Sequence, residues 1–359
     1  MDTTVTRSPF DQVDASRDLS QLIRSNTHQY WAYMKHRADI GSLQPYLPFE
    51  GVLAGDPHLG NFSVLPLRRV GGTRRMRFVD VDFDDAGRGP FVLDIVRYLI
   101  AAKSISREIK KRPLERSYLA GIAGKKLAPP KSVRALLDMP VSDYDARAVH
   151  YTKKKSSKRG FIFKAGKIEP YDARIARATI ERLFAGRQVI DLALRPVNRG
   201  GSIGQLRIWV LVEDRKSRRI MELKQYGESA VAKYQAQPAV DEWLNEVRGT
   251  FWPGLDGSAY DLVDLSGAGL FWLREKHVSL IDVPYSSQKD RNIAFLNDLA
   301  AYDANVLGLA HGRQAQGGPY RALVEKDPEA FHDAVKPVVR AYLALAREKF
   351  RDKQLGSKT

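Results

Sequence analysis

Two stretches decide the fold of this chain: Gly55-Asp-Pro-His-Leu-Gly-Asn-Phe62, and FVDVDFDDAGRGPFVLD from Phe78 to Asp94. The first holds an Asp-Pro turn followed by an asparagine, and Asp56 and Asn61 are five positions apart. The second begins as an apolar strand and continues into acidic residues. An Asp-Pro turn or an acidic cluster after a strand is common alone, but the combination indicates one functional site.

The spacing of these residues is typical of kinase-type phosphoryl transfer. There, a loop Asp positions the substrate hydroxyl, an Asn five residues later binds magnesium, and the Asp of an Asp-Phe pair binds the metal between the phosphates. Magnesium needs such oxygen ligands and leaves room for phosphates. The sequence therefore predicts Asp56 as the catalytic residue and Asn61 and Asp82 as metal ligands, with His58 and Asp84 as accessory residues.

A calcium-binding loop is the rival interpretation of Asp80, Asp82 and Asp84. Such a loop carries Gly at its sixth position and Glu at its twelfth. Here these positions hold Asp85 and Phe91, and the sequence excludes a calcium loop.

Composition excludes several classes of protein. The 359 residues include 58 Lys and Arg, 42 Asp and Glu and no Cys, which gives a net charge of +16. Without Cys there is no disulfide scaffold, thiolate metal site or cysteine nucleophile. The opening MDTTVTRSPFDQVD lacks a signal-peptide pattern, and no apolar run is long enough for a membrane span. We therefore expect a cytoplasmic protein that contains no membrane-spanning segment.

The hydrophobic pattern predicts helices and strands in separate regions. Helical periodicity covers 14–38, 92–103, 240–247, 293–311 and 329–351, and 113–186 is mostly helical. Short strands are expected at 49–54 and 77–81, around a turn at 71–73, and further strands in the segments VIDLALRPV, QLRIWVLVE, RRIMELKQY and LFWLREKHVSLIDV. The fold class is α+β, with a small antiparallel sheet.

The segment Gly200-Gly201-Ser202-Ile203-Gly204 is a candidate phosphate loop. Gly-x-Ser-x-Gly is also the nucleophile elbow of hydrolases, but an elbow precedes a helix, and this turn precedes the alternating strand QLRIWVLV. Backbone N–H groups of glycines can approach phosphate oxygens closely. A plain hairpin turn remains the alternative.

Lys224 ends an apolar strand 20 residues after Gly204, from where its ammonium could reach the α and β phosphates. An exposed lysine at a strand edge is the alternative. If Lys224 binds phosphates, its acidic partner is expected on the next helix, where Glu242 and Glu246 are both candidates.

The basic run from Lys153 to Arg159 is a candidate for nucleic-acid binding. A positive surface concentrates any polyanion, and the run is followed by the apolar triplet 161–163. A solvated basic loop is the simpler interpretation.

Gly-Asp-x-His-x-x-Asn followed by Val-Asp-Phe-Asp-Asp-Ala-Gly-x-Gly-Pro resembles the aminoglycoside phosphotransferase and choline kinase group of kinase-like enzymes. Most of the chain, roughly 55–313, is similar to the bacterial family known as domain of unknown function 2252. The similar segments are GDPHLGNF at 55–62, DFDDAGRGPFVLDIVRYL at 82–99, GGSIG at 200–204, ELK ending at Lys224, and LGLAHGR at 307–313. Ala54 and Gln225 depart from the kinase pattern, which has His and Glu there.

The resemblance implies a two-lobed, protein kinase-like fold that is circularly permuted, because the glycine loop and lysine follow the catalytic loop. The implied parts are 1–187, with the catalytic loop and a helical lobe, a β lobe at 188–285, and helices at 286–359 that return to the helical lobe. In it, Gly200, Gly201, Ser202, Gly204 and Lys224 hold the phosphates, and Asp94 and Arg97 form a buried pair that supports the loop. His58 and His311 are either site residues or, more simply, histidines satisfied by loop backbone.

The sequence therefore predicts a Mg²⁺-dependent, ATP-utilising phosphotransferase that acts on an unidentified hydroxyl acceptor, which is a small molecule or a protein. Nucleotidyl transfer is a variant on the same scaffold. The alternatives are a nucleic-acid-binding protein and a pseudokinase that binds nucleotide without turnover.

Overall fold

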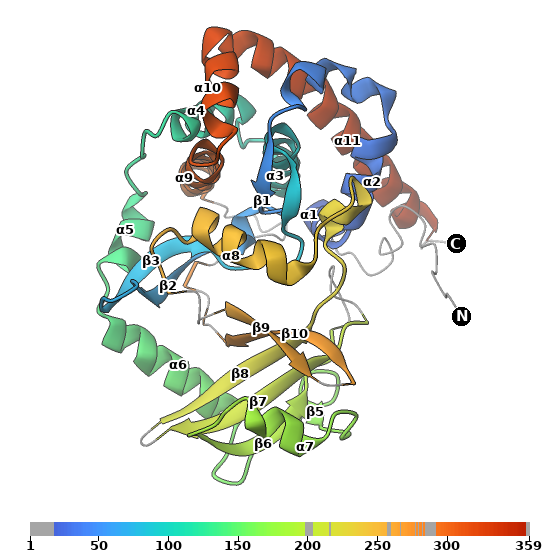
Figure 1. Cartoon of the computed structure of the whole chain (residues 1–359). Helices are drawn as coiled ribbons and strands as arrows, with labels where there is room; N and C mark the ends of the chain where they lie inside the picture. The colour runs from blue at the N-terminus through green and yellow to red at the C-terminus, as the bar shows by residue number, and fades with distance from the viewer. Residues whose placement is uncertain are drawn as a thin grey trace.

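The computed structural model describes residues 18–356 except 198–203, 215–216, 257–259, 266, 277, 279, 282 and 284–291. It is a mixed α+β protein, with most helices at one end and the largest sheet at the other (Figure 1). The helices are α1 (Leu19–Ser25), α2 (Thr27–His36), α3 (Phe91–Ile105), α4 (Lys111–Ile122), α5 (Lys131–Leu137), α6 (Val141–Lys155), α7 (Arg177–Arg182), α8 (Val240–Phe251), α9 (Ile293–Gly312), α10 (Gly317–Lys326) and α11 (Pro328–Gly356), and the short 3-10 helices η1 (Ala38–Tyr46), η2 (Leu59–Asn61) and η3 (Ala230–Lys233). No described helix is both long and apolar enough to cross a membrane.

The largest sheet is antiparallel and has the order β5-β6-β7-β8-β10-β9. Its strands are β5 (Glu169–Pro170), β6 (Gln188–Leu194), β7 (Arg207–Asp214), β8 (Ser217–Gln225), β9 (Tyr260–Leu265) and β10 (Gly269–Glu275). The sheet therefore begins before residue 188. Edge strand β9 was not predicted because its acidic residues, Asp261 and Asp264, weaken the apolar pattern of YDLVDL.

The predicted strands at 49–54 and 77–81 are present but do not form one hairpin. β2 (Phe62–Arg68) pairs with β3 (Arg74–Asp80) around the glycine turn, whereas β1 (Glu50–Leu53) pairs with β4 (Gly87–Pro90). β2 contains Pro66, which argues against a central strand but is tolerated in a two-stranded ribbon, where both strands are edges. The two ribbons place residues 54–61 and 81–86, the loops that carry the predicted site, at their ends.

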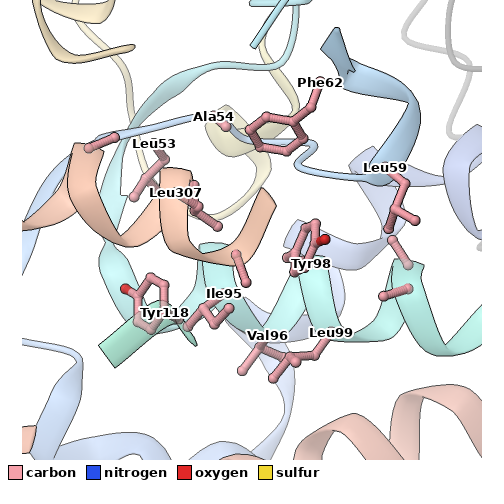
Figure 2. Packing of buried hydrophobic residues seen from close by; sticks show 14 of the residues in the cluster. Leu53, Ala54, Leu59, Phe62, Ile95, Val96, Tyr98, Leu99, Tyr118 and Leu307 are labelled. Atoms are coloured by element: carbon pink, nitrogen blue, oxygen red, sulfur yellow. The ribbon is translucent and has the colours of Figure 1, made fainter. Parts of the chain in front are cut away.

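Helix α3 is the centre of the main apolar core. It is buried almost throughout, as its continuous apolar sequence predicts. Figure 2 shows Ile95, Val96 and Leu99 of α3, Leu53 of β1 and Leu307 of α9, which all belong to this core. The same core contains side chains from α1, α2 and α11, so that both ends of the described chain pack on α3. The predicted N-terminal helix is divided into α1 and α2 at Asn26.

Glycines allow α4 and α9 to pack closely. A Cβ at Gly308 would clash with the Tyr118 carbonyl oxygen of α4, and a Cβ at Gly121 would clash with the Asn305 carbonyl oxygen of α9. One turn beyond Gly308, a Cβ at Gly312 would lie 2.5 Å from the Ile122 carbonyl oxygen. These contacts are with backbone, which cannot move aside as a flexible side chain can.

We expect Gly308→Ala to destabilise the protein by about 1–3 kcal/mol, the usual cost of overpacking a core. The matched control is Gly249→Ala in α8, because nothing lies within 4 Å of a Cβ at Gly249. There the higher helix propensity of alanine should stabilise by up to about 1 kcal/mol. Urea unfolding measures both changes, and equal effects of the two substitutions would contradict close packing of α4 on α9.

Asp303 in α9 predicts a pH-dependent stability. Its side chain is fully buried, and its hydrogen-bond partner among the described residues is the Tyr98 hydroxyl, at 3.3 Å. Burial raises the pKa of Asp303 well above its usual value. The folded state therefore binds this proton more tightly than the unfolded state, and the free energy of unfolding falls as pH rises from about 4 toward the raised pKa.

Asp303→Asn should remove this loss of stability. Near pH 4 the variant and the natural protein should be similarly stable, and the variant's advantage should grow by up to about 1.4 kcal/mol per pH unit. Urea unfolding across this pH range measures the difference. Asp298→Asn, on an exposed position of the same helix, should show no such trend; a pH-independent effect of Asp303→Asn would contradict the prediction.

Candidate active site

The loop after β1 is held by a buried carboxylate on α3. Asp94 accepts hydrogen bonds from the backbone N–H groups of Ala54, at 2.9 Å, and Gly55, at 3.0 Å. Gly55 has a φ of +78°, and a Cβ there would clash with the Asp85 carbonyl oxygen. Only glycine fits this position, because the loops at 54–61 and 81–86 touch at their backbones.

Asp94 is itself held by His311 of α9. His311 Nε2 lies 3.2 Å from Asp94 Oδ2, and His311 Nδ1 lies 2.8 Å from the Tyr118 hydroxyl. Since a carboxylate only accepts, Nε2 donates to Asp94. His311 is fully buried and acts on the loop through Asp94, so it is a supporting residue. Its hydrogen-bond partners are side chains, and not the loop backbone that the simpler interpretation of the sequence expected.

Asp56 is oriented by Arg97, one turn after Asp94 on α3. Arg97 is fully buried, and its Nε and Nη2 donate to Asp56 Oδ1 at 2.9 and 2.6 Å. Asp94 and Arg97 are both buried and support the loop, as expected, but they bind different parts of it instead of each other. One turn of α3 therefore fixes both the backbone and the carboxylate of the loop, because residues three apart share a helix face.

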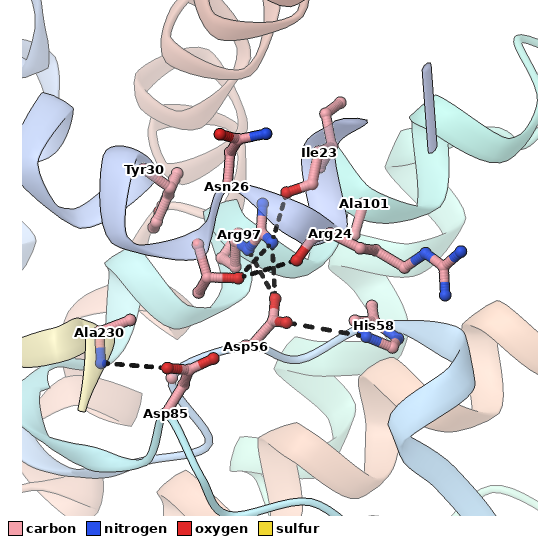
Figure 3. A network of polar contacts seen from close by, with 12 residues as sticks. Ile23, Arg24, Asn26, Tyr30, Asp56, His58, Asp85, Arg97, Ala101 and Ala230 are labelled. Carbon is pink, nitrogen blue, oxygen red and sulfur yellow. Dashed lines mark hydrogen bonds and ion pairs between the residues drawn. The ribbon is translucent and has the colours of Figure 1, made fainter. Parts of the chain in front are cut away.

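The second oxygen of Asp56 faces His58. Figure 3 shows Asp56 between Arg97 and His58, and the Nε2–Oδ2 distance is 3.7 Å. His58 Nδ1 accepts from the Gly60 N–H at 3.0 Å, which begins η2. Burial lowers the pKa of His58 to about 4, so the ring is neutral at pH 7. Asn61 follows, and its Nδ2 donates to the Asp56 carbonyl oxygen at 2.9 Å.

The loop after β3 brings a second group of carboxylates to the same place. The Tyr260 hydroxyl lies 3.0 Å from Asp84 Oδ1 and 3.5 Å from Asp82 Oδ1. Burial alone would raise the pKa of Asp82, but the positive charges of Lys224 and Arg274 outweigh it and lower this pKa below its usual value. Asp82 is therefore ionised, and the positive charges of Lys224 and Arg274 lie close to it.

Lys224 is buried at the end of β8 and contacts these carboxylates. Its ammonium forms an ion pair with Asp84 Oδ2 and lies 4.0 Å from Asp82 Oδ1. Burial lowers the pKa of Lys224 to about 8. The prediction that Glu242 or Glu246 is its partner is wrong in this structure: both side chains are exposed on α8, and Glu246 pairs with Arg88.

The sequence did not reveal the ion pair of Arg274 and Glu222. Arg274 of β10 lies opposite Glu222 of β8, and its Nε and Nη2 donate to Glu222 Oε1 at 3.0 and 2.9 Å. Arg274 Nη1 is also 3.6 Å from Asp82 Oδ1. The available signal was the strand alternation, which puts Glu222 on the same face as Lys224 and the buried Ile220. A charged residue at such a position needs a partner.

One pocket of about 260 Å³ is lined by side chains from all of these loops and by Lys224, whereas Arg97, Glu222 and Arg274 are not among its lining residues. Of the predicted phosphate loop, the structure describes Gly204, which has a positive φ and is not among the residues that line the pocket, whereas Gly200, Gly201 and Ser202 lie outside the described residues. The residues that line the pocket are Gln21, Arg24, Ser25 and His28 of α1 and α2, Asp56, His58 and Asn61, Asp82, Asp84 and Asp85, and Gln205, Lys224, Gly227 and Glu228.

Among the described residues, no three His, Asp or Glu side chains converge in an arrangement that would hold a metal ion by themselves. No family model, curated protein or solved structure was found to match the chain. Its function is therefore argued from the geometry of the pocket.

Replacing Arg97 tests how strongly the loop depends on its buried ion pair. We expect Arg97→Gln to destabilise the protein by about 3–5 kcal/mol, because Asp56 loses the partner that compensates its charge. Arg88→Gln breaks the exposed pair with Glu246 and should cost no more than about 1 kcal/mol. Urea unfolding measures both, and similar small losses would show that the loop does not need Arg97.

Proposed function

We propose that this protein is a Mg²⁺-dependent, ATP-utilising phosphotransferase that acts on a hydroxyl acceptor. The observation that carries the proposal is the convergence of Asp56, Asn61, Asp82 and Lys224 on one pocket. They come from three separate segments of the chain, and each is of the residue type that phosphoryl transfer requires at its position. Their convergence supports a common role.

Asp56 is the residue proposed to act on the acceptor. Arg97 holds Oδ1, so that Oδ2 is the oxygen available to accept the proton of the hydroxyl. In the proposed reaction the hydroxyl oxygen forms a bond to the γ phosphorus of ATP, the bond from this phosphorus to the β–γ bridging oxygen breaks, and ADP leaves. His58 lies beside Oδ2, and because its ring is neutral it does not compensate the negative charge of the Asp56 carboxylate.

The pocket suits a cation that is shared with phosphates. Asn61 uses its Nδ2 within the loop, which leaves Oδ1 as a ligand, and Asp82 supplies an ionised carboxylate. Magnesium takes one or two protein ligands and completes its shell with phosphates and water. When bound, it would neutralise the charge on the phosphate oxygens. Gln205 Oε1 is buried in the wall without a hydrogen-bond partner among the described residues, and it suits a donor group of the nucleotide.

Lys224 is proposed to bind the α and β phosphates. Its ammonium pairs with Asp84 in this structure, and both side chains line the pocket. Phosphate oxygens offer the same negative charge as this carboxylate, so a bound nucleotide can replace Asp84 as the partner of the lysine.

We further propose the two-lobed, circularly permuted kinase-like fold, with family resemblance to domain of unknown function 2252. The proximity of the end of α9 to β1 supports it. Gln314, two residues after α9, accepts from the Val52 N–H at 2.6 Å and donates to the Val52 carbonyl oxygen at 2.8 Å. The end of α9 and the start of the loop are thus neighbours in space, as they would be in an unpermuted chain.

Calorimetric titration with ATP, with and without Mg²⁺, tests the site. Asp82→Ala should abolish metal-dependent binding because the ionised ligand is lost. Asp56→Asn should leave binding intact and lower transfer by about 10²–10⁴-fold, the usual contribution of a general base. Transfer is assayed with hydroxyl-bearing small molecules and proteins, and product mass separates phosphoryl from nucleotidyl transfer.

Glu246→Gln is the matched control, since it removes a carboxylate that lies outside the pocket, and it should change neither binding nor transfer. Metal-dependent binding that survives Asp82→Ala would contradict the assignment. Metal-dependent binding with no transfer to any acceptor would instead identify a pseudokinase.

A further inference from the structure

A second surface of the molecule combines strong positive charge with exposed apolar side chains. We define the basic hairpin as residues 153–168, which include seven Lys and Arg residues and no Asp or Glu. It starts at the end of α6 and leads into β5. In the described part of the chain, none of these seven cations forms an ion pair with a carboxylate. The cations are Lys153, Lys154, Lys155, Lys158, Arg159, Lys164 and Lys167.

Ile162 and Phe163 are exposed at the centre of the basic hairpin. Their side chains are 50% and 48% exposed, and among the described residues only Val70 and Leu127 are comparably large, apolar and exposed. Ile162 and Phe163 are adjacent in sequence, whereas Val70 and Leu127 lie apart on other loops. Two neighbouring apolar side chains within a cluster of cations mark an interaction site.

The fold fixes this exposure. Phe161 and Ile168, on either side, are buried against Trp209 of β7. The Phe161 N–H donates to Asp191 Oδ2 at 2.7 Å, and the Lys164 N–H donates to the Ile168 carbonyl oxygen at 2.7 Å. Because its flanks are anchored to the sheet, the segment holds Ile162 and Phe163 outward and cannot turn them into the core.

The basic hairpin and the candidate active site lie at opposite ends of β8. Arg218, near the start of this strand, donates to the Ser157 and Lys158 carbonyl oxygens, whereas Lys224, near its end, lines the pocket. The hairpin leads into β5, the edge strand opposite β9, whereas the pocket is formed at β8 and the loops near β10. Figure 1 shows β5 and β6 at the end of the molecule away from α3 and α9. A large partner could therefore contact the hairpin without covering the pocket.

We propose that the basic hairpin docks on an anionic membrane surface, with Ile162 and Phe163 inserted at the level of the lipid headgroups and the lysines against lipid phosphates. Cationic segments that also carry exposed apolar side chains bind such interfaces, and the two contributions reinforce each other. Single-stranded nucleic acid fits less well, because base stacking needs aromatic faces; of the two exposed side chains only Phe163 has one, and Phe161 is buried. The proposal is independent of the proposed enzymatic function.

Co-sedimentation of the full chain with vesicles tests the docking surface. We expect binding to phosphatidylcholine vesicles that contain phosphatidylglycerol and none to phosphatidylcholine alone. Replacing both apolar residues, Ile162→Ser with Phe163→Ser, should weaken binding by about tenfold or more, since apolar insertion is lost. Lys153→Gln and Lys154→Gln should weaken it about fivefold each.

Two matched controls separate docking from general surface effects. Val70→Ser removes an exposed apolar side chain from the β2–β3 turn, and Lys125→Gln with Lys126→Gln removes two cations outside the hairpin; all should bind as the natural protein does. The proposal is overturned by absence of binding to anionic vesicles, by binding that is insensitive to the Ile162 and Phe163 changes, or by equal losses in the controls. Binding to a fluorescent single-stranded oligonucleotide that displaces the vesicles and depends on Phe163 but not on Ile162 would assign the surface to nucleic acid instead.

Discussion

The buried carboxylate of Asp94 is the interaction on which the rest of the site depends. It satisfies two backbone N–H groups of the loop after β1 and is held in turn by His311. A buried carboxylate without such partners would be strongly unfavourable, so α3, the loop and α9 must come together for any of them to be stable. Arg97, one turn later, extends the constraint to the side chain of Asp56. The position of the candidate catalytic carboxylate is therefore a consequence of how the helical core packs.

The sheet contributes through cross-strand register. Because Lys224 lies opposite Trp272 and Glu222 lies opposite Arg274, one face of β8 and β10 presents charged groups to the loop that carries Asp82. Burial disfavours each charge, and the neighbouring opposite charges compensate. Removing one member of this group would leave the others uncompensated, which is why such networks form as a unit or not at all.

Local sequence patterns predicted the parts of this structure that local forces determine. The continuous apolar run of α3 and the alternation of β7 each identify an element without knowledge of its neighbours. The pairing of β1 with β4 could not be predicted, because both are four-residue strands whose partners are set by tertiary contacts. The spacing of Asp56, Asn61 and Asp82 indicated the site, but the partners of Lys224 and Arg97 depend on which chain segments meet in space. The family resemblance implied a buried pair of Asp94 and Arg97, and the structure uses their spacing on the helix to direct both residues at the loop.

Charge in the pocket gives a physical reason why nucleotide binding should require a metal. Five carboxylates line it, from Asp56, Asp82, Asp84, Asp85 and Glu228, against the cations Arg24 and Lys224. Burial raises the pKa of Asp85 to about 7, and the other four carboxylates still outnumber the two cations. His58 is neutral because burial lowers its pKa. A triphosphate that entered without a metal ion would meet net negative charge at short range. The net charge of +16 on the whole chain does not offset this, because salt screens charges that are more than about 10 Å away. A divalent cation between the carboxylates and the phosphates reverses the sign of this interaction. The two proposals therefore assign different ligands to the basic surface and the acidic pocket: a polyanion alone to the surface, and a nucleotide together with a divalent cation to the pocket.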